Sequence, residues 1–317
     1  MSERALVTGA GGFVGANLVR RLLADGVTVV ATARPGPRPW RLADVEADVE
    51  VLQVDLRDAA AVEAAAIAAR PARVYHLAAH GAYSWQRDLR AMVDVNILAT
   101  RALLDAARAL GGAALVMTGS SSEYGLKDHA PREDEALDPN SEYAVTKAAG
   151  THLCRLAAVR DGIPAVVLRL YSVYGPWEEP GRLVPALVRR GLDGELPPLV
   201  APETARDYVY VDDACEAIFS AGRAAESLRG EVLNVGSGRQ TTLRELVDVA
   251  RAALGVDATP VWGTMAQRAW DATTWVADPS AAERRMGWRA TTTLPDGLTR
   301  TAAWMAADQR LRDRYTA

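Results

Sequence analysis

Cysteine, lysine and phenylalanine are nearly absent from this sequence, and long apolar runs are missing altogether. The two cysteines, Cys154 and Cys215, exclude a disulfide scaffold and a cysteine-rich zinc site. No spacing of His, Asp and Glu suggests another metal site. No apolar run approaches the ~18 residues of a membrane span, and the N-terminus has no signal-peptide pattern. The net charge of −4 gives no electrostatic reason to bind nucleic acid or an anionic membrane. We therefore expect a soluble, cytoplasmic protein that binds neither nucleic acid nor a membrane.

The scarcity of lysine makes the lysines that are present informative. Only Lys127 and Lys147 occur among 36 basic residues, so arginine is used wherever a positive charge suffices. A lysine kept in such a sequence suggests that its position requires that side chain.

The first half of the 317 residues alternates apolar runs with helical spacing. Strands separated by helices form βαβ units, which assemble into a parallel sheet. The fold class is therefore α/β, a Rossmann-type doubly wound parallel sheet. The predicted strands are 5–8, 27–33, 49–54, 73–77, 113–118 and 165–170, and the predicted helices are 14–24, 59–69, 91–110 and 143–160.

The regular alternation of strands and helices ends after residue 170. Proline and glycine interrupt the chain, and five of the eight tryptophans lie in the last third. This predicts a smaller α/β substrate-binding domain on the C-terminal side.

A glycine-rich loop follows the first predicted strand. Gly9 and Gly12, with Phe13 and Val14 opening the next helix, would let the backbone approach a pyrophosphate held at the helix N-terminus. The plain alternative is a tight turn. Placement between a clear strand and a clear helix favours dinucleotide binding.

The end of the second predicted strand bears on which dinucleotide binds. NAD-binding folds place an acid there for the ribose 2′-hydroxyl, whereas this chain has Arg34, with Arg38 and Arg41 nearby. Arginine suits a 2′-phosphate because its planar fork binds phosphate oxygens in pairs. NADP(H) is therefore favoured over NAD(H), the alternative being that these are solvated loop arginines.

Tyr143 and Lys147 lie four residues apart on one face of a predicted helix. A free tyrosine has a pKa near 10, and an adjacent ammonium group is expected to lower that pKa towards neutrality. Ser120 follows the fifth predicted strand, where ligands bind in such sheets, and its hydroxyl is expected to bond a substrate carbonyl. We predict Ser120, Tyr143 and Lys147 as catalytic residues.

With these motifs in order, the chain resembles the extended short-chain dehydrogenase/reductase family, whose members act mainly on nucleotide-diphosphate sugars. The resemblance covers almost the whole chain. It rests on the Gly9 loop, the Asp55-Leu56-Arg57-Asp58 segment, His76-Leu77-Ala78-Ala79, Asn96, the Ser120 loop, Tyr143 and Lys147, Leu168-Arg169, Tyr174-Gly175-Pro176, residues 206–213 and residues 234–238.

The resemblance implies further roles. Asp55 and Leu56 would flank the adenine, and Leu77, Ala78 and Ala79 would lie beneath the cofactor. It also implies a cofactor domain at 1–170, to which part of 207–236 returns, and a substrate domain at 171–206 and 237–317. The resemblance also implies four substrate residues. Arg206 and Arg268 would hold the diphosphate, and Arg182 belongs to a segment that would line the nucleotide site. Ser172 would lie near the substrate, at a position where the family commonly has Asn.

Residues beside these motifs complete the predicted substrate site. His80 and Tyr83 follow the cofactor strand and would border the sugar, although an ordinary loop with one packed aromatic explains them equally well. Ser121 and Ser122 continue the Ser120 loop towards the substrate.

Three reactions share this set of residues. The favoured interpretation is an NADP(H)-dependent reductase of a nucleotide-diphosphate 4-keto sugar, because the loop most resembles that of GDP-4-keto-6-deoxymannose reductases. A 4-epimerase and a 4,6-dehydratase remain open, the latter requiring Glu123 as its acid. A non-catalytic binding protein would be expected to have lost Tyr143 or Lys147. Homodimers are common in the family through helices that correspond to 91–110 and 143–160. The sugar and the nucleotide stay undetermined.

Overall fold

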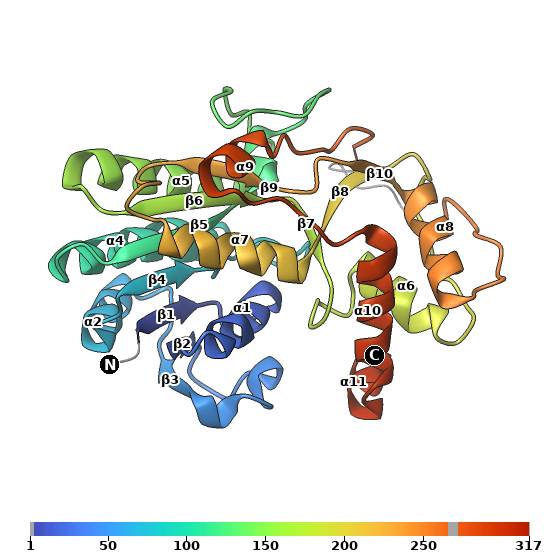
Figure 1. The fold of residues 1–317 in the computed structure, drawn as a ribbon, viewed down its shortest axis with the longest axis horizontal. Coiled ribbons are helices and arrows are strands. Elements are labelled where there is room, and N and C mark those ends of the chain that lie inside the picture. The colour runs from blue at the N-terminus through green and yellow to red at the C-terminus, as the bar shows by residue number, and fades with distance from the viewer. Residues whose placement is uncertain (1–2, 266–271, 317) are drawn as a thin grey trace.

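The computed structural model describes residues 3–265 and 272–316, and a seven-stranded sheet dominates it (Figure 1). The strand order is β3-β2-β1-β4-β5-β6-β9, with parallel pairing between neighbours. This confirms the predicted Rossmann-type α/β fold. Its strands are β1 (Arg4–Thr8), β2 (Thr28–Ala33), β3 (Val49–Gln53), β4 (Arg73–His76), β5 (Ala114–Ser120), β6 (Ala165–Leu170) and β9 (Val232–Val235).

Helices cover both faces of this sheet because each strand alternates its apolar side chains between the two sides. Ala5 and Val7 of β1 join the core beneath α1 and α7, whereas Leu6 joins the core beneath α2, α4 and α5. The helices are α1 (Phe13–Ala24), α2 (Ala59–Ala69), α3 (Leu89–Val93), α4 (Ala99–Ala109), α5 (Glu142–Asp161) and α7 (Val211–Arg223), and the short 3₁₀ turns are Trp40–Leu42, Glu46–Asp48 and Ser121–Tyr124.

A second, three-stranded sheet has the order β10-β8-β7, with β7 and β8 parallel and β8 and β10 antiparallel. It lies to the right of the large sheet in Figure 1, with helices beside and below it. The strands are β7 (Ser172–Tyr174), β8 (Ala205–Tyr210) and β10 (Gln240–Thr242), and the helices of the second half are α6 (Leu183–Gly191), α8 (Leu243–Leu254), α9 (Ser280–Met286), α10 (Leu294–Ala306) and α11 (Gln309–Arg314).

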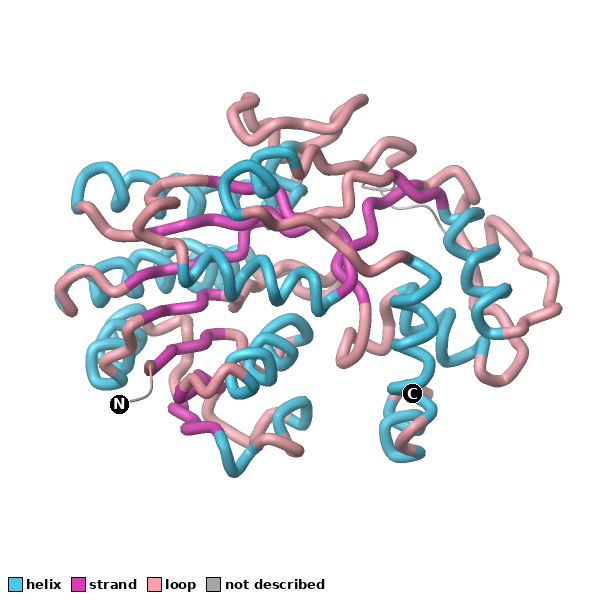
Figure 2. The backbone as a smooth tube through the Cα atoms, in the orientation of Figure 1, coloured by secondary structure: helices cyan, strands magenta, loops and turns pink. Residues whose placement is uncertain are grey.

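The chain passes between the two sheets several times. Only Tyr171 separates β6 in the large sheet from β7 in the small one. After β8 the chain returns through α7 to β9, and then leaves again for β10. Figure 2 shows the strands of both sheets meeting near the middle of the molecule.

Three tryptophans fasten the C-terminal helices to the first half of the chain. The Trp177 ring lies 5.5 Å from that of Trp40 and 5.0 Å from that of Trp304. Arg41, after β2, forms an ion pair with Glu179 at 3.0 Å. The loop that carries Trp177 and Glu179 is therefore held from both sides.

The predicted helix at 91–110 is not continuous. A π-helical turn at Asp94–Leu98 separates α3 from α4. Such turns insert one residue into the helical repeat and often occur at functional sites.

Candidate functional site

The glycine-rich loop has the backbone geometry that a pyrophosphate requires. Gly9 has φ +72°, and a Cβ there would lie 2.6 Å from the Ala78 nitrogen. A Cβ at Gly15 would collide with the Gly9 carbonyl oxygen, so this glycine lets α1 approach β1. No side chain caps the N-terminus of α1, and its first turn holds no acid. The residues present therefore fit a bound dinucleotide, with the helix N-terminus facing the phosphates.

The three arginines after β2 have different surroundings. Arg41 is buried and bonded to the Trp177 carbonyl as well as to Glu179. Arg38 forms a surface ion pair with Glu46. Arg34 is exposed and lies close enough to Asp55 to help lower the pKa of that carboxyl, although the main cause is hydrogen bonding from Arg57.

The floor of the predicted cofactor site follows β4. Leu77, Ala78 and Ala79 leave the strand next to Gly9, as the Ala78 contact shows. His76 is buried between Thr8, 2.7 Å from Nδ1, and Thr100, 3.0 Å from Nε2. Burial lowers the pKa of His76 to about 3, so its imidazole is neutral and serves as a hydrogen-bonded support.

The three predicted catalytic residues come from the end of β5 and from α5. Ser120 ends β5, and its side chain lies close enough to Tyr143 to oppose the rise in the pKa of that phenol. Lys147 is 3% exposed, and its ammonium group donates to the Thr118 carbonyl at 2.6 Å. A serine, a tyrosine and a lysine thus converge at the carboxyl edge of the sheet, beside the residues that follow β4.

The expected lowering of the Tyr143 pKa is wrong for the protein as described. Burial raises the pKa of this phenol to about 12 and outweighs the opposing effects of the Ser120 hydrogen bond and the Arg182 charge. Burial also lowers the pKa of Lys147. The phenol therefore keeps its proton at neutral pH.

Glu123 does not serve as the free acid that a dehydratase would need. Its carboxylate is fully buried and accepts bonds from the Ser120 amide at 2.8 Å, the Thr151 hydroxyl at 2.9 Å and Arg169 Nε at 2.9 Å. It closes a capping box on the turn Ser121–Tyr124. This carboxylate is structural, so Glu123 is not available as the acid that the dehydratase alternative assigned to it.

The other side chains of the serine loop are hydrogen-bonded. Ser122 Oγ lies 2.7 Å from Ser120 Oγ. Ser121 Oγ accepts a bond from Trp275 Nε1 at 3.1 Å. Trp275 in turn has the Arg206 guanidinium 5.3 Å from its ring centroid. The serine loop is thereby linked to the second half of the chain.

The remaining predicted substrate residues lie on several elements. Tyr83 stacks on Trp85 at 4.6 Å, with the Arg182 guanidinium 5.9 Å from its ring. Both Tyr83 and Arg182 act electrostatically on Tyr143, so both lie near the catalytic group. Ser172 pairs with Tyr208 between β7 and β8, and Arg268 lies outside the described residues.

Three further residues shape the site without having been predicted as site residues. The Asn96 amide group accepts from the His80 N–H and donates to its carbonyl, which fixes the segment that carries Tyr83. Asp207 is fully buried and accepts from the Ser237, Gly238 and Ala277 amides. Glu178 is 6% exposed and lies near Arg182. Asn96 could have been found from sequence, because it is one of the residues that carry the family resemblance. Glu178 belongs to no such motif.

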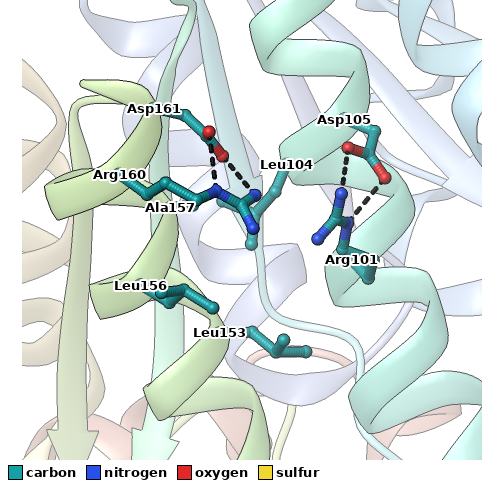
Figure 3. Close-up of a pocket in the computed structure, with 8 residues that line it drawn as sticks. All are labelled: Arg101, Leu104, Asp105, Leu153, Leu156, Ala157, Arg160 and Asp161. Atoms are coloured by element: carbon teal, nitrogen blue, oxygen red, sulfur yellow. Dashed lines mark hydrogen bonds and ion pairs between the residues drawn. The ribbon is translucent and has the colours of Figure 1, made fainter.

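A separate shallow pocket lies between α4 and α5 (Figure 3). It contains none of the predicted catalytic, cofactor or substrate residues. Its lining residues are Arg101, Leu104, Asp105, Leu153, Leu156, Ala157, Arg160 and Asp161. Within residues 3–265 and 272–316, no group of His, Cys, Asp and Glu is arranged to hold a metal ion, and no helix could cross a membrane.

This fold and site together are those of a dinucleotide-dependent enzyme. Comparison with known proteins is more specific. Residues 5–236 match the NAD dependent epimerase/dehydratase family. A curated dTDP-glucose 4,6-dehydratase from Streptomyces griseus is 32% identical, with 96% of this chain and 94% of the relative covered. The UDP-glucose 4-epimerase of Mycolicibacterium smegmatis is 31% identical, with 94% and 97% covered.

Solved structures agree with these relatives. The UDP-glucose 4-epimerase of Thermotoga maritima, solved with UDP-glucose, superposes with a TM-score of 0.85 at 26% identity, covering 96% of this chain and 99% of that one. The UDP-glucuronic acid 4-epimerase of Bacillus cereus, solved with UDP-glucuronic acid and NAD, gives 0.82 at 28% identity with the same coverage. The chain belongs to the NAD dependent epimerase/dehydratase family and is an enzyme of that family.

Proposed function

We propose that the protein carries out oxidation and reduction at C4 of a nucleotide-diphosphate sugar, as a 4-epimerase, with Tyr143 as the acid and base. The observation that carries this proposal is the convergence of Ser120, Tyr143 and Lys147 at the sheet edge, in a serine loop whose one carboxylate, Glu123, is buried and paired. Without a free acid in that loop, chemistry at C4 is favoured over dehydration. The epimerases among the relatives support the same reaction.

Each catalytic side chain has a definite task in this proposal. Tyr143 takes the proton from the sugar O4 and returns it, and Ser120 donates a hydrogen bond to the same oxygen. Lys147 stabilises the phenolate from the next turn of α5. A bound nicotinamide supplies the redox chemistry and, when oxidised, a positive charge that favours the phenolate. The Gly9 loop, Asp55 and the residues after β4 would hold it.

An NADP(H)-dependent 4-keto sugar reductase is the second candidate, and Arg34 favours it. Arg34 is exposed at the end of β2, where an acid would select NAD. The Arg34→Ala variant should raise the KM for NADPH by about 10-fold to 100-fold while leaving that for NADH unchanged, since a charged bond to phosphate would be lost. Arg38→Ala is the matched control. Equal effects on both cofactors would overturn the NADP preference.

Two experiments test the proposed reaction. The purified enzyme is incubated with UDP-, dTDP- and GDP-hexoses, with and without added NAD⁺ or NADP⁺, and the products are followed by NMR. Interconversion of C4 epimers supports the epimerase. Stoichiometric oxidation of NADPH with a 4-keto sugar supports the reductase, and a 4-keto-6-deoxy product from an unmodified hexose contradicts both.

Tyr143→Phe should lower kcat by about 10²-fold to 10⁴-fold, the usual contribution of a positioned acid or base, while nucleotide-sugar affinity stays within twofold. Tyr210→Phe removes a hydroxyl elsewhere and is the control. An unchanged kcat in Tyr143→Phe would refute the assigned role.

We also propose that the chain forms a homodimer through α4 and α5. Three exposed apolar side chains lie on α5, namely Val145, Leu156 and Val159, and Leu98 is exposed in the turn that leads into α4. An exposed apolar patch marks an interaction site. Val159 is 86% exposed and Val145 is 51% exposed, and Leu156 lines the pocket of Figure 3.

The two-part organisation completes the proposal. The cofactor would bind to residues 1–170. The segment 207–236 returns to this part, because its strand β9 joins the large sheet. The sugar nucleotide would bind between this part and the part formed by 171–206 and 237–317. Ser121, Ser122, Ser172, Arg182 and Arg206 would then contact it.

A further inference from the structure

Glu178 is a buried acid in the loop between β7 and α6. It follows Trp177, whose φ of +69° is unusual for a residue with a side chain. The Glu178 amide donates to the Gly175 carbonyl at 3.3 Å, and its own carbonyl accepts from the Tyr315 hydroxyl at 2.6 Å. The backbone of Glu178 is therefore fixed by its own loop and by the C-terminal end of the described chain.

The carboxyl group of Glu178 lacks the partners that a buried acid normally has. Its residue is 6% exposed, and Oε2 has no hydrogen-bond partner within the described residues. Oε1 lies 3.8 Å from Arg182 Nε, which is too long for a hydrogen bond. Glu123 at 0% exposure accepts three bonds, so this protein does satisfy buried acids where the role is structural. A buried polar atom left without a partner costs free energy unless a ligand supplies one.

Printed contacts connect Glu178 to the catalytic end of the proposed site. Its Oε1 lies 3.8 Å from Arg182 Nε, and the Arg182 guanidinium lies 5.9 Å from the centroid of the Tyr83 ring. The charge of Glu178 acts on Tyr83, which acts in turn on Tyr143 at the catalytic end. It also raises the pKa of Tyr208, whose pKa the Arg206 charge at the predicted diphosphate end lowers. Arg182 acts on Tyr143, Tyr83 and Tyr208 alike. A sugar with O4 at Tyr143 and its diphosphate at Arg206 would bring its hydroxyls towards this group.

We propose that Glu178 binds a hydroxyl of the substrate sugar between Tyr143 and Arg206, and that it thereby helps to determine which sugar is accepted. This inference rests on the proposed function and names a sugar contact within that same site. A sugar hydroxyl both donates and accepts, so it satisfies Oε2 whichever protonation state the carboxyl has.

The protonation of Glu178 suits an anionic ligand. Burial raises the pKa of this carboxyl to about 8, against the opposing charge of Arg182. Glu179 on the same loop and Tyr83, Tyr208 and Tyr315 from the surrounding elements are the other titratable groups that interact with it. At neutral pH the carboxyl is mostly neutral, so it adds little repulsion towards a diphosphate.

The test compares a nucleotide with its sugar derivative. Binding of UDP and UDP-glucose, dTDP and dTDP-glucose, and GDP and GDP-mannose to the full-length protein is measured by calorimetry, and the pair whose sugar nucleotide binds most tightly is used. Glu178→Leu should weaken sugar-nucleotide binding by about 10-fold to 100-fold and change binding of the bare nucleotide less than twofold. Glu178→Gln should restore most of the loss, since an amide still bonds a hydroxyl.

Glu195→Gln removes an exposed carboxylate outside this loop and is the control, expected to leave both affinities within twofold. Equal weakening of nucleotide and sugar nucleotide in Glu178→Leu would mean that the loop itself is disturbed, and an unchanged sugar contribution would mean no contact; either overturns the proposal. If the wild type binds no nucleotide or sugar nucleotide of the set, the proposed function is wrong, and this inference is wrong as well because it rests on that function. A wild type that binds and epimerises its sugar, beside an unaffected Glu178→Leu, defeats the inference alone.

Discussion

Two buried glutamates show how differently one side chain can be used in this protein. Glu123 accepts bonds from a main-chain amide, a hydroxyl and a guanidinium, so its negative charge is fully compensated. Glu178 has one oxygen without a partner and a pKa that burial raises to about 8. Satisfied hydrogen bonding points to architecture, whereas a buried oxygen without a partner points to a ligand.

The architectural role of Glu123 leads to a stability prediction. Glu123→Ala leaves the Arg169 guanidinium, itself 2% exposed, buried without its anionic partner. Breaking a buried pair from one side should lower the free energy of unfolding by about 3–5 kcal/mol. Denaturant unfolding of the purified variant measures this, with the exposed Glu195→Gln as a control expected to change stability by less than about 0.5 kcal/mol. A Glu123→Ala protein as stable as the wild type would contradict the structural role.

The raised pKa of Glu178 leads to a prediction about pH. Between pH 4.5, its ordinary pKa, and about 8 the folded carboxyl binds a proton that the unfolded chain has released. This group's contribution to folding stability therefore falls as pH rises through that window and levels off above it. The melting temperature of the wild type should drop relative to that of Glu178→Gln from pH 5 to pH 8.5. A difference that does not vary with pH would mean that the carboxyl ionises normally.

At the scale of elements, six of the seven strands of the large sheet could be predicted, whereas β9 and the second sheet could not. The predicted strands at 5–8, 49–54 and 165–170 match β1, β3 and β6 within a residue or so, because buried parallel strands are short apolar runs. The strands β7 and β10 have three residues each, too few for a pattern to form.

The candidate site divides in the same way. Tyr143 and Lys147 could be proposed from sequence because four residues on one helix form a local pattern. The Trp275–Ser121 bond and the position of Glu178 beside Tyr83 join segments far apart in the chain. Only the folded structure brings such residues together, so no spacing in the sequence could reveal them.

The π-turn at Asp94–Leu98 is an element that apolar periodicity cannot detect, because α3 and the turn have only five residues each, too few to show where the helical phase shifts. It carries Asn96, whose side chain bonds both main-chain groups of His80 and the Thr146 hydroxyl. The turn therefore connects the segment after β4 to α5, which bears Tyr143.

Asn96→Ala should release this connection. Two main-chain groups of His80 would lose their partners, so we expect faster hydrogen exchange at the His80 amide and a loss of about 1–3 kcal/mol in stability. Exchange is followed by NMR or mass spectrometry on the segment that spans His80. The exposed Asn140→Ala should change neither quantity. Unaltered exchange in Asn96→Ala would show that the segment is held by other contacts.

At the scale of the whole molecule, the chain binds its two parts together by repeated crossing. The loop after β7 carries Trp177, Glu178 and Glu179. It is held between the turn Trp40–Leu42, which follows β2, and the C-terminal helices. The same loop thus stabilises the junction of the two parts and supplies the proposed sugar contact. Movement between the parts would be transmitted directly to Glu178.

In the proposed dimer, a second copy packs on α4 and α5. A two-fold dimer buries the same patch on both subunits, so one substitution acts twice in each interface. Val159→Glu places a charge at a position that is 86% exposed in the single chain and apolar in character. We expect it to convert a dimer into a monomer in sedimentation and light-scattering experiments while the fold, followed by circular dichroism, stays intact. Ile67→Glu, on α2 and 38% exposed, introduces the same charge on a different surface and should leave the dimer unaffected. A wild type that sediments as a monomer at micromolar concentration would exclude the dimer. A Val159→Glu protein that stays dimeric would place the interface on another surface.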